Sequence, residues 1–111
     1  MYATTEEVFF VDWDLKGAFW EYDNPEAMKS YKASPHLFVN NWDTPIMVIH
    51  GEKDFRIPYT QGMAAFNTAK MKGLEAQFLY YPEECHWVNR PQNSILWHRE
   101  FKKWLDKWLK D

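Results

Sequence analysis

The pattern of hydrophobic and polar positions divides the chain into two parts. The first 44 residues contain no run that is typical of a β-strand. Beyond them, the short and continuously apolar run Ile46–Ile49 predicts a strand that is covered on both faces, as in a parallel sheet. The segment Ala76–Tyr81 predicts a second strand, with alternate side chains on its two sides.

A helical pattern follows each predicted strand. Between about Tyr59 and Lys72, mainly apolar side chains recur at the helical period. Gly73 stands where a helix commonly ends in a left-handed residue. Pro91 suits the first position of a final helix. The order strand, helix, strand, helix predicts an α/β fold with two parallel strands joined by a right-handed crossover. Two parallel strands alone leave unpaired edges, so we expect them to belong to a larger sheet.

The first 44 residues predict helices. Acidic residues within Thr4–Glu7 favour a helix start, because negative charge stabilises the amino end of a helix. The apolar face of that helix would consist of Val8, Phe9, Phe10 and Trp13. Asn24 followed by a proline predicts a second helix that ends near Ser34, and His36–Asn41 predicts a short helical turn.

Aromatic residues are abundant for a chain of 111 residues, with seven Trp, six Tyr and eight Phe. A small domain has too little interior to bury so much aromatic surface easily. Either the rings line grooves of a tightly packed domain, or some of them pack against a part of the protein outside this chain. The second interpretation also predicts a homo-oligomer, or association with that missing part, through the open strand edge or the aromatic helices.

Charge and composition exclude several classes of function. The net charge is −3 with acids and bases interspersed, so the basic patch that nucleic-acid binding needs is absent. No run approaches the roughly 20 apolar residues that span a bilayer, and we expect no membrane partner. The single cysteine excludes an internal disulfide and leaves the compartment, periplasm or cytoplasm, undetermined. The histidines lack metal-binding spacing, and we expect no metal or cofactor.

An aspartate and a histidine follow the two predicted strands. Asp54 lies in the loop after the first strand, and His86 lies in the loop after the second. The carboxyl ends of neighbouring parallel strands meet at one edge of a sheet, so the two side chains can come into contact. Each has a plainer explanation, Asp54 as a turn-forming aspartate and His86 as a half-buried structural histidine. Together, in the order acid then histidine, they favour the second half of a Ser-Asp-His triad.

The nucleophile of such a triad is missing from the sequence. The serines, Ser30, Ser34 and Ser94, lie outside any G-x-S-x-G motif. Cys85 precedes His86 and raises the alternative of a Cys-His pair. Consecutive side chains in a loop usually diverge, however, and a cysteine nucleophile needs oxyanion donors of its own. We therefore expect the chain alone to be inactive.

Three segments of the chain resemble the C-terminal end of the catalytic domain in the prolyl oligopeptidase family, in particular its bacterial dipeptidyl-peptidase and acylaminoacyl-peptidase branch. They are TPIMVIHGEKDFRIPYTQG, LYYPEECHWV and PQNSILWHREFKKWLDKWL. The resemblance implies a C-terminal fragment of an α/β-hydrolase fold, with two parallel strands and flanking helices. Residues 1–44 would be a helical lead-in, and residues 45–111 would carry the triad acid and base, which fall on Asp54 and His86. The nucleophilic serine, and further upstream a β-propeller domain, would precede Met1.

The resemblance also implies substrate-binding residues. Arg56 would bind a backbone carbonyl of the substrate, with a surface ion pair to Glu52 or Glu83 as the alternative. Ile57 would line the pocket for the substrate residue before the cleaved bond. Tyr2 would line the same pocket, unless it belongs to a frayed terminus.

Taken together, these features predict the C-terminal part of a serine-type exopeptidase that hydrolyses short peptides. The chain would supply the acid and the base, and the serine would come from upstream. A rival hypothesis belongs to another class of protein, a non-catalytic interaction or assembly module that retains a hydrolase-like fold. A peptide substrate is expected of the complete enzyme.

Overall fold

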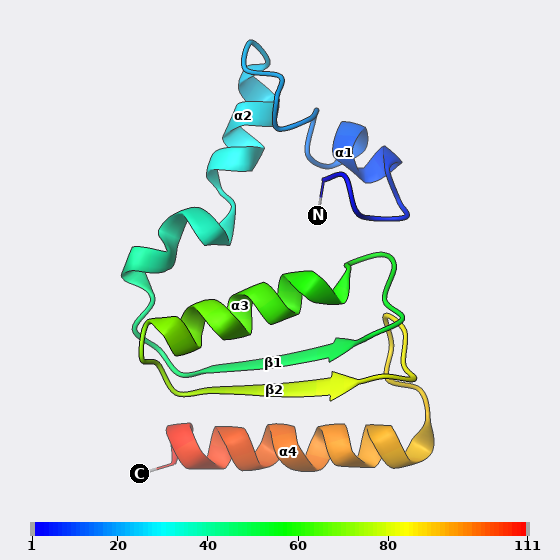
Figure 1. Ribbon diagram of the computed structural model, residues 1–111, viewed down its shortest axis with the longest axis vertical. Coiled ribbons are helices and arrows are strands. Elements are labelled where there is room, and N and C mark those ends of the chain that lie inside the picture. The colour runs from blue at the N-terminus through cyan, green and yellow to red at the C-terminus, as the bar shows by residue number, and fades with distance from the viewer. Residues whose placement is uncertain (1, 111) are drawn as a thin grey trace. The chain divides into compact units, whose positions relative to one another are not determined.

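A computed structural model describes residues 2–110 of the chain (Figure 1). Contacts between residues divide the chain into two compact units, residues 1–42 and residues 43–111. The elements described in the first unit are all helical, and both strands lie in the second. Each unit is therefore considered by itself.

The N-terminal unit begins differently from the sequence-based prediction. Helix α1 (Phe9–Trp13) starts later and is shorter than expected. The Thr5 hydroxyl oxygen accepts a hydrogen bond from the backbone N–H of Glu7 at 3.1 Å, and this local turn competes with a helix over Thr4–Glu7. The expected apolar face is also largely unburied, because its exposed members include Val8, Phe9 and Trp13.

Two later helices of this unit confirm the prediction. Helix α2 (Pro25–Lys32) follows Asn24, whose side-chain oxygen accepts hydrogen bonds from the backbone N–H groups of Glu26 and Ala27, each at 3.2 Å. These bonds satisfy donors that a helix start would otherwise leave free. The 3₁₀ helix η1 (Pro35–Asn41) coincides with the predicted helical turn.

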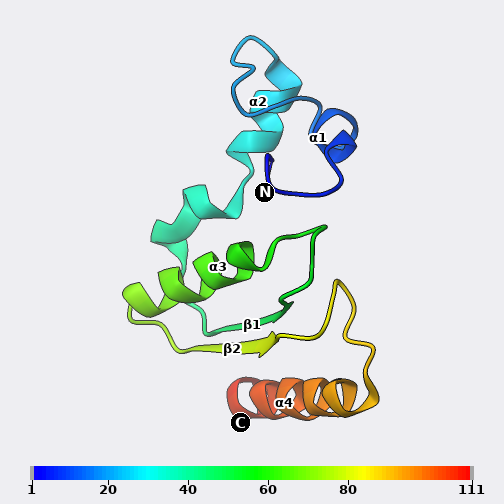
Figure 2. The ribbon, with the colours of Figure 1, turned by 45° about the vertical axis from the view of Figure 1, so that its right-hand side comes forward.

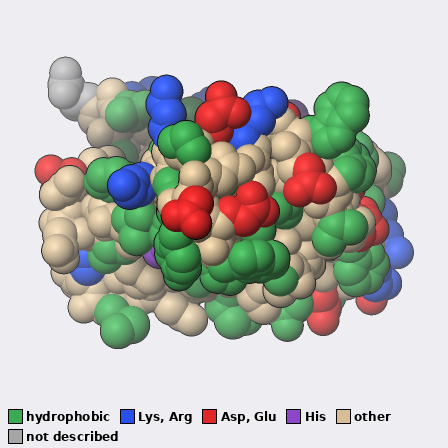
Figure 3. All heavy atoms as spheres, turned by 90° about the horizontal axis from the view of Figure 1, so that it is seen from above, with side chains coloured by type: hydrophobic (Ala, Val, Ile, Leu, Met, Phe, Trp, Pro, Cys, Tyr) green, Lys and Arg blue, Asp and Glu red, His purple; other side chains and the backbone are tan. Residues whose placement is uncertain are grey.

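Aromatic rings pack against one another in the N-terminal unit. The ring centroid of Phe19 lies 5.7 Å from that of Tyr2 and 4.9 Å from that of Trp20, both in edge-on geometry. The buried apolar residues of the unit are small, namely Val11, Ala18 and Ala27. Figure 3 shows hydrophobic side chains at the surface, between acidic and basic ones.

In the C-terminal unit, two strands lie between two helices. Strand β1 (Ile46–Gly51) pairs with strand β2 (Ala76–Tyr81) in parallel and in register along their whole length. Helix α3 (Tyr59–Met71) covers one face of this pair, and helix α4 (Pro91–Leu109) lies on the other, as Figures 1 and 2 both show. The predicted β-α-β-α order is confirmed, with β1 two residues longer than its apolar run.

Side chains of β2 alternate between the two helices. Phe78 packs on Phe66 of α3 with ring centroids 5.6 Å apart. Tyr81 faces the other way, and its hydroxyl donates to the backbone oxygen of Asn93 in α4 at 3.4 Å. Helix α3 is followed by Gly73 at φ +77°, a conformation that costs glycine little, and this confirms the predicted C-cap.

The sheet of this unit is small. Within residues 2–110 it consists of β1 and β2, so the edge of β1 away from β2 has no strand beside it. Apolar side chains of α4 are exposed as well, including Ile95 and Leu109. No helix in the described part of the chain combines the length and the apolar character that crossing a bilayer requires.

Candidate active site

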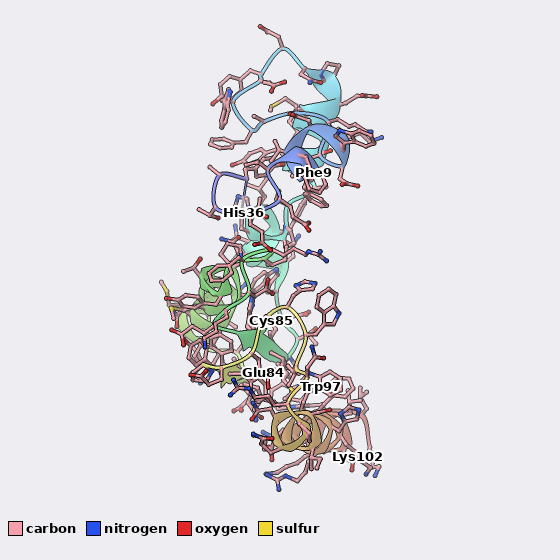
Figure 4. All side chains as sticks on the ribbon, turned by 90° about the vertical axis from the view of Figure 1, so that its right-hand side faces the viewer. Phe9, His36, Glu84, Cys85, Trp97 and Lys102 are labelled. Atoms are coloured by element: carbon pink, nitrogen blue, oxygen red, sulfur yellow. The ribbon has the colours of Figure 1, made fainter. Side chains whose placement is uncertain are left out.

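Two loops meet at the carboxyl ends of the strands, residues 52–58 after β1 and residues 82–90 after β2. Their backbones are bonded together, because the N–H of Lys53 donates to the carbonyl oxygen of Glu84 at 2.9 Å. Gly51 permits this approach, since a Cβ at that position would lie 2.4 Å from the carbonyl oxygen of Cys85. Figure 4 labels Glu84 and Cys85 on the second loop. The absence of a side chain at Gly51 thus leaves room for the two loops to be in contact.

Asp54 is the fixed member of the site. Its side chain is 7% exposed, and its backbone N–H donates to the Gly51 carbonyl at 3.2 Å. Oδ1 accepts a hydrogen bond from the backbone N–H of Ile57 at 2.8 Å. Oδ2 is left to face the second loop. The carboxylate is therefore held by its own loop before any partner side chain is counted.

His86 is that partner. Its Nδ1 lies 2.9 Å from Asp54 Oδ2, so the expected hydrogen bond between the two loops is present. A carboxylate accepts hydrogen bonds, and Nδ1 must therefore carry the proton in this pair. The neutral ring then has its lone pair on Nε2. With a side chain that is 34% exposed, His86 is placed to exchange a proton with a group outside the pair.

A buried carboxylate that the sequence analysis missed holds the His86 loop. Glu84 is 3% exposed, and its carboxylate accepts hydrogen bonds from the backbone N–H groups of Asn89 and Arg90 and from the side chain of Asn93 at 2.6 Å. These bonds, that from Asn93 foremost, hold the pKa of Glu84 below its usual range. Its backbone donors, Asn89 and Arg90, lie in the loop just before α4, and the third donor is the side chain of Asn93 within that helix. The signal in the sequence was an acid two residues before the histidine and five and six residues before these loop amides.

A cleft of about 560 Å³ opens beside the pair. Ile57 and His86 line it from the two loops, and Ile49 lines it from β1. Ser94 and Trp97 contribute from α4, on which Figure 4 labels Trp97. The cleft is thus bounded by the acid–base loops and by an aromatic helix face. Among the described residues, no group of three or more His, Cys, Asp or Glu side chains is placed to hold a metal ion.

Comparison with known proteins shows the family. The sequence model that describes the prolyl oligopeptidase family matches residues 1–111. The chain belongs to the prolyl oligopeptidase family.

Individual relatives are consistent with this membership. Dipeptidyl-peptidase 5 of Porphyromonas gingivalis is 57% identical over 109 residues, which cover 98% of this chain and 16% of that protein. Dipeptidyl-peptidase 5 of Trichophyton schoenleinii is 40% identical over 108 residues, which cover 94% of this chain and 14% of the relative. The chain therefore spans between about a seventh and a sixth of the length of these curated relatives.

A solved structure supplies the fold. The uncomplexed acylaminoacyl peptidase of Pyrococcus horikoshii matches with a TM-score of 0.78 and 21% identity, over 99% of this chain and 18% of that chain. The architecture is accordingly a fragment of the α/β-hydrolase fold, with two parallel strands and flanking helices.

The remaining residues that the family resemblance assigned are placed as follows. Ile57 lines the cleft. The Arg56 guanidinium lies 5.4 Å from the centroid of the Trp87 ring, and that ring is edge-on to His86 at 4.9 Å. Glu83, offered as an alternative partner of Arg56, forms an ion pair with Lys53 at 2.7 Å.

The sequence raised two alternatives, a frayed terminus at Tyr2 and a nucleophilic pair of Cys85 with His86, and the contacts in the structure match neither. Tyr2 belongs to the N-terminal unit, where its ring packs on Phe19 and Tyr31, and these contacts do not fit a frayed terminus. Burial, and after it the neighbouring Tyr31, raises the pKa of the Tyr2 phenol. The Cys85 thiol donates to the backbone oxygen of Trp87 at 3.7 Å, while Nδ1 of His86 is bonded to Asp54. The roles of Tyr2, Arg56 and Ile57 in binding substrate stay predictions.

Proposed function

We propose that this chain supplies the acid and the base of a Ser-Asp-His triad in a serine-type exopeptidase that hydrolyses short peptides. The observation that carries the proposal is the 2.9 Å hydrogen bond from His86 Nδ1 to the buried Asp54, which leaves Nε2 as the basic nitrogen of a partly exposed ring. Membership of the prolyl oligopeptidase family and the likeness to dipeptidyl-peptidase 5 support the reaction class.

In the proposed reaction, His86 Nε2 accepts the proton of the serine hydroxyl as the oxygen attacks the peptide carbonyl. The imidazolium then gives this proton to the leaving amine and becomes neutral again. In the second half of the reaction, the neutral ring accepts a proton from the water that attacks the acyl-serine, and it returns this proton to the serine oxygen as the ester bond breaks. Asp54 keeps the ring in the Nδ1–H tautomer and stabilises the charge that forms on it. Ile57 forms part of the wall that contacts the substrate side chain, and Arg56 binds a substrate carbonyl.

The serine is proposed to lie on a part of the polypeptide outside these 111 residues. Ser30 and Ser34 belong to the N-terminal unit, and Ser94 is the described serine that lines the cleft. The uncovered edge of β1 and the exposed apolar side chains of α4 are surfaces that such a part would cover.

Activity assays test the proposal directly. The 111-residue chain and the complete protein are compared on dipeptidyl and acylaminoacyl reporter substrates, and both are treated with a fluorophosphonate that labels reactive serines. We expect turnover and labelling in the complete protein and neither in the chain alone. Ser94→Ala is the matched control, because a serine in the cleft is removed while the triad stays intact.

Two outcomes would overturn parts of the proposal. Labelling of the chain alone that disappears in the Ser94→Ala variant would make Ser94 a nucleophile. A complete protein that neither hydrolyses the reporters nor reacts with the fluorophosphonate would favour the rival function, a non-catalytic assembly module with a hydrolase-like fold.

A further inference from the structure

A second histidine contacts the same aspartate as His86. His50, the penultimate residue of β1, has a side chain that is 10% exposed, and its Nε2 lies 3.5 Å from Asp54 Oδ2. The same Nε2 lies 2.7 Å from the backbone carbonyl oxygen of Ile57. Because a carbonyl oxygen only accepts hydrogen bonds, His50 Nε2 must carry a proton and donate it.

The backbone of Ile57 is thereby held from two directions. Its N–H donates to Asp54 Oδ1 at 2.8 Å, and its carbonyl oxygen accepts from His50 Nε2 at 2.7 Å. A shift of the carboxylate must therefore move a piece of backbone that is anchored to β1. This arrangement links the acid of the pair to the wall of the cleft, since Ile57 lines that wall.

Helix α3 in turn holds His50 in place. Gly62 lies so close to the imidazole that a Cβ at this position would be 2.6 Å from His50 Nδ1. The next contact of such a Cβ would be Val48, 3.1 Å away on the same face of β1. The ring is thus confined between the helix and the loop that carries Asp54, and its Nε2 points to two acceptors of that loop.

We propose that His50 is a positioning residue, whose Nε2–H holds the Ile57 carbonyl and thereby fixes Asp54 in the orientation that accepts the hydrogen bond from His86 Nδ1. The catalytic meaning of this role rests on the proposed function, but the geometry is measurable without turnover. His50 acts through Asp54 and Ile57. Loss of its donor leaves the loop carbonyl unbonded and allows the carboxylate to turn away from His86.

The first measurement needs no substitution. Ring ¹⁵N shifts of the histidine-labelled chain at neutral pH distinguish the two neutral tautomers and the charged ring. We expect His50 to carry its proton on Nε2. A neutral His50 with its proton on Nδ1 has no donor for Ile57, and that result would overturn the proposal even if every variant failed to fold.

The second measurement compares two amides at position 50. The terminal nitrogen of His50→Gln reaches the place of Nε2, whereas that of His50→Asn reaches only the place of Nδ1. The readout is the far-downfield proton of His86 Nδ1, with circular dichroism to verify the fold. We expect the resonance in the wild type and in His50→Gln, and its loss in His50→Asn. The control is His36→Asn, an exposed histidine of the N-terminal unit, which keeps the resonance.

The same variants separate this inference from the proposed function. In an active complete protein, we expect His50→Asn to lower kcat by about 10²-fold with little change in KM, and His50→Gln to restore most of it. Equal behaviour of the two amides in the resonance would overturn the inference. A complete protein without peptidase activity would overturn the proposed function alone, because the tautomer and the resonance are still measured.

Discussion

Asp54 and His86 form one hydrogen-bonded pair, but the two loops hold them by different means. The 52–58 loop binds the Asp54 carboxylate through its own backbone, and the side chain is 7% exposed. The 82–90 loop is instead organised by a different carboxylate, that of Glu84, while His86 itself is 34% exposed. The comparison indicates that the acid is immobilised directly. The base is positioned indirectly, because it needs contact with a group outside the pair.

The largest effect should follow from changing the acid. We expect Asp54→Asn in the complete protein to lower kcat by about 10⁴-fold, because an amide allows the wrong tautomer of His86 to bond. The folded structure should change little, because the amide oxygen can still accept from the Ile57 N–H. Steady-state kinetics beside a urea unfolding curve test this. A loss of less than tenfold would mean that the two loops do not cooperate as acid and base.

Gly51 is the point at which the loops touch, and a methyl group there should push them apart. We expect Gly51→Ala to lower the free energy of unfolding by about 3 kcal/mol, because the new Cβ overlaps backbone that cannot easily move aside. Gly73→Ala is the matched control. It meets no atom within 4 Å and bears only the strain of its positive φ, about 1 kcal/mol. Equal losses of unfolding free energy in the two variants, measured in urea, would show that the backbone around Gly51 can move to accommodate a Cβ.

The sequence predicted the second unit better than the first for a physical reason. Around β1 and α3, the apolar run, the helical period and Gly73 all indicate the same elements, and packing agrees with them. At Thr4–Glu7 the acidic residues favoured a helix, but the Thr5 hydroxyl formed a local turn, and no buried face was available to compensate. Capping at Asn24 was predictable because it depends on neighbours in the sequence.

The sequence was sufficient to predict the acid–base pair of the candidate site, but not the residues that hold the pair in place. Asp54 and His86 follow consecutive strands, and the parallel topology alone brings those loops together. Glu84 was missed because its donors depend on how the 82–90 loop folds back on itself and on where the start of α4 places the side chain of Asn93. The role of His50 likewise depends on a carbonyl seven residues away and on the close packing of Gly62.

Glu84 offers a smaller and pH-dependent test of the indirect support. Its folded pKa is depressed, so the folded state binds a proton less readily than the unfolded state. The stability that it contributes is therefore present above the ordinary glutamate pKa of about 4.3, and it is lost as pH falls through the lower folded pKa. We expect Glu84→Gln to reduce the slope of the unfolding free energy as a function of pH in this acidic window. We also expect it to lower kcat by about tenfold, because the loop that carries His86 loses part of its support.

Glu83 and Asp106 also have lowered pKa values, but both are present in wild type and in Glu84→Gln. Their contributions therefore cancel when the two profiles of unfolding free energy against pH are subtracted, and the remainder belongs to Glu84. Identical acid profiles of the two proteins would show that the bonds to Glu84 do not stabilise the loop.

The smallest effect should come from the ion pair across the outer surface of the loops. Lys53 and Glu83 approach to 2.7 Å, but their side chains are 52% and 55% exposed, and water screens the attraction. We expect Lys53→Met to leave the urea midpoint and kcat unchanged within error, at low salt and at high salt. A change as large as that of Glu84→Gln would mean that surface charge, rather than the buried bonds, holds the loops together.

The close approach at Gly51 has a consequence for motion. A movement that separates the two loops must also break the bonds from the N–H of Lys53 to the carbonyl of Glu84 and from the N–H of Glu52 to the carbonyl of Tyr81, each 2.9 Å long. Hydrogen exchange at these two amides therefore measures how often the site comes apart. Lys53 and Glu52 take no part in the proposed chemistry, yet their amide exchange should follow the lifetime of the assembled pair.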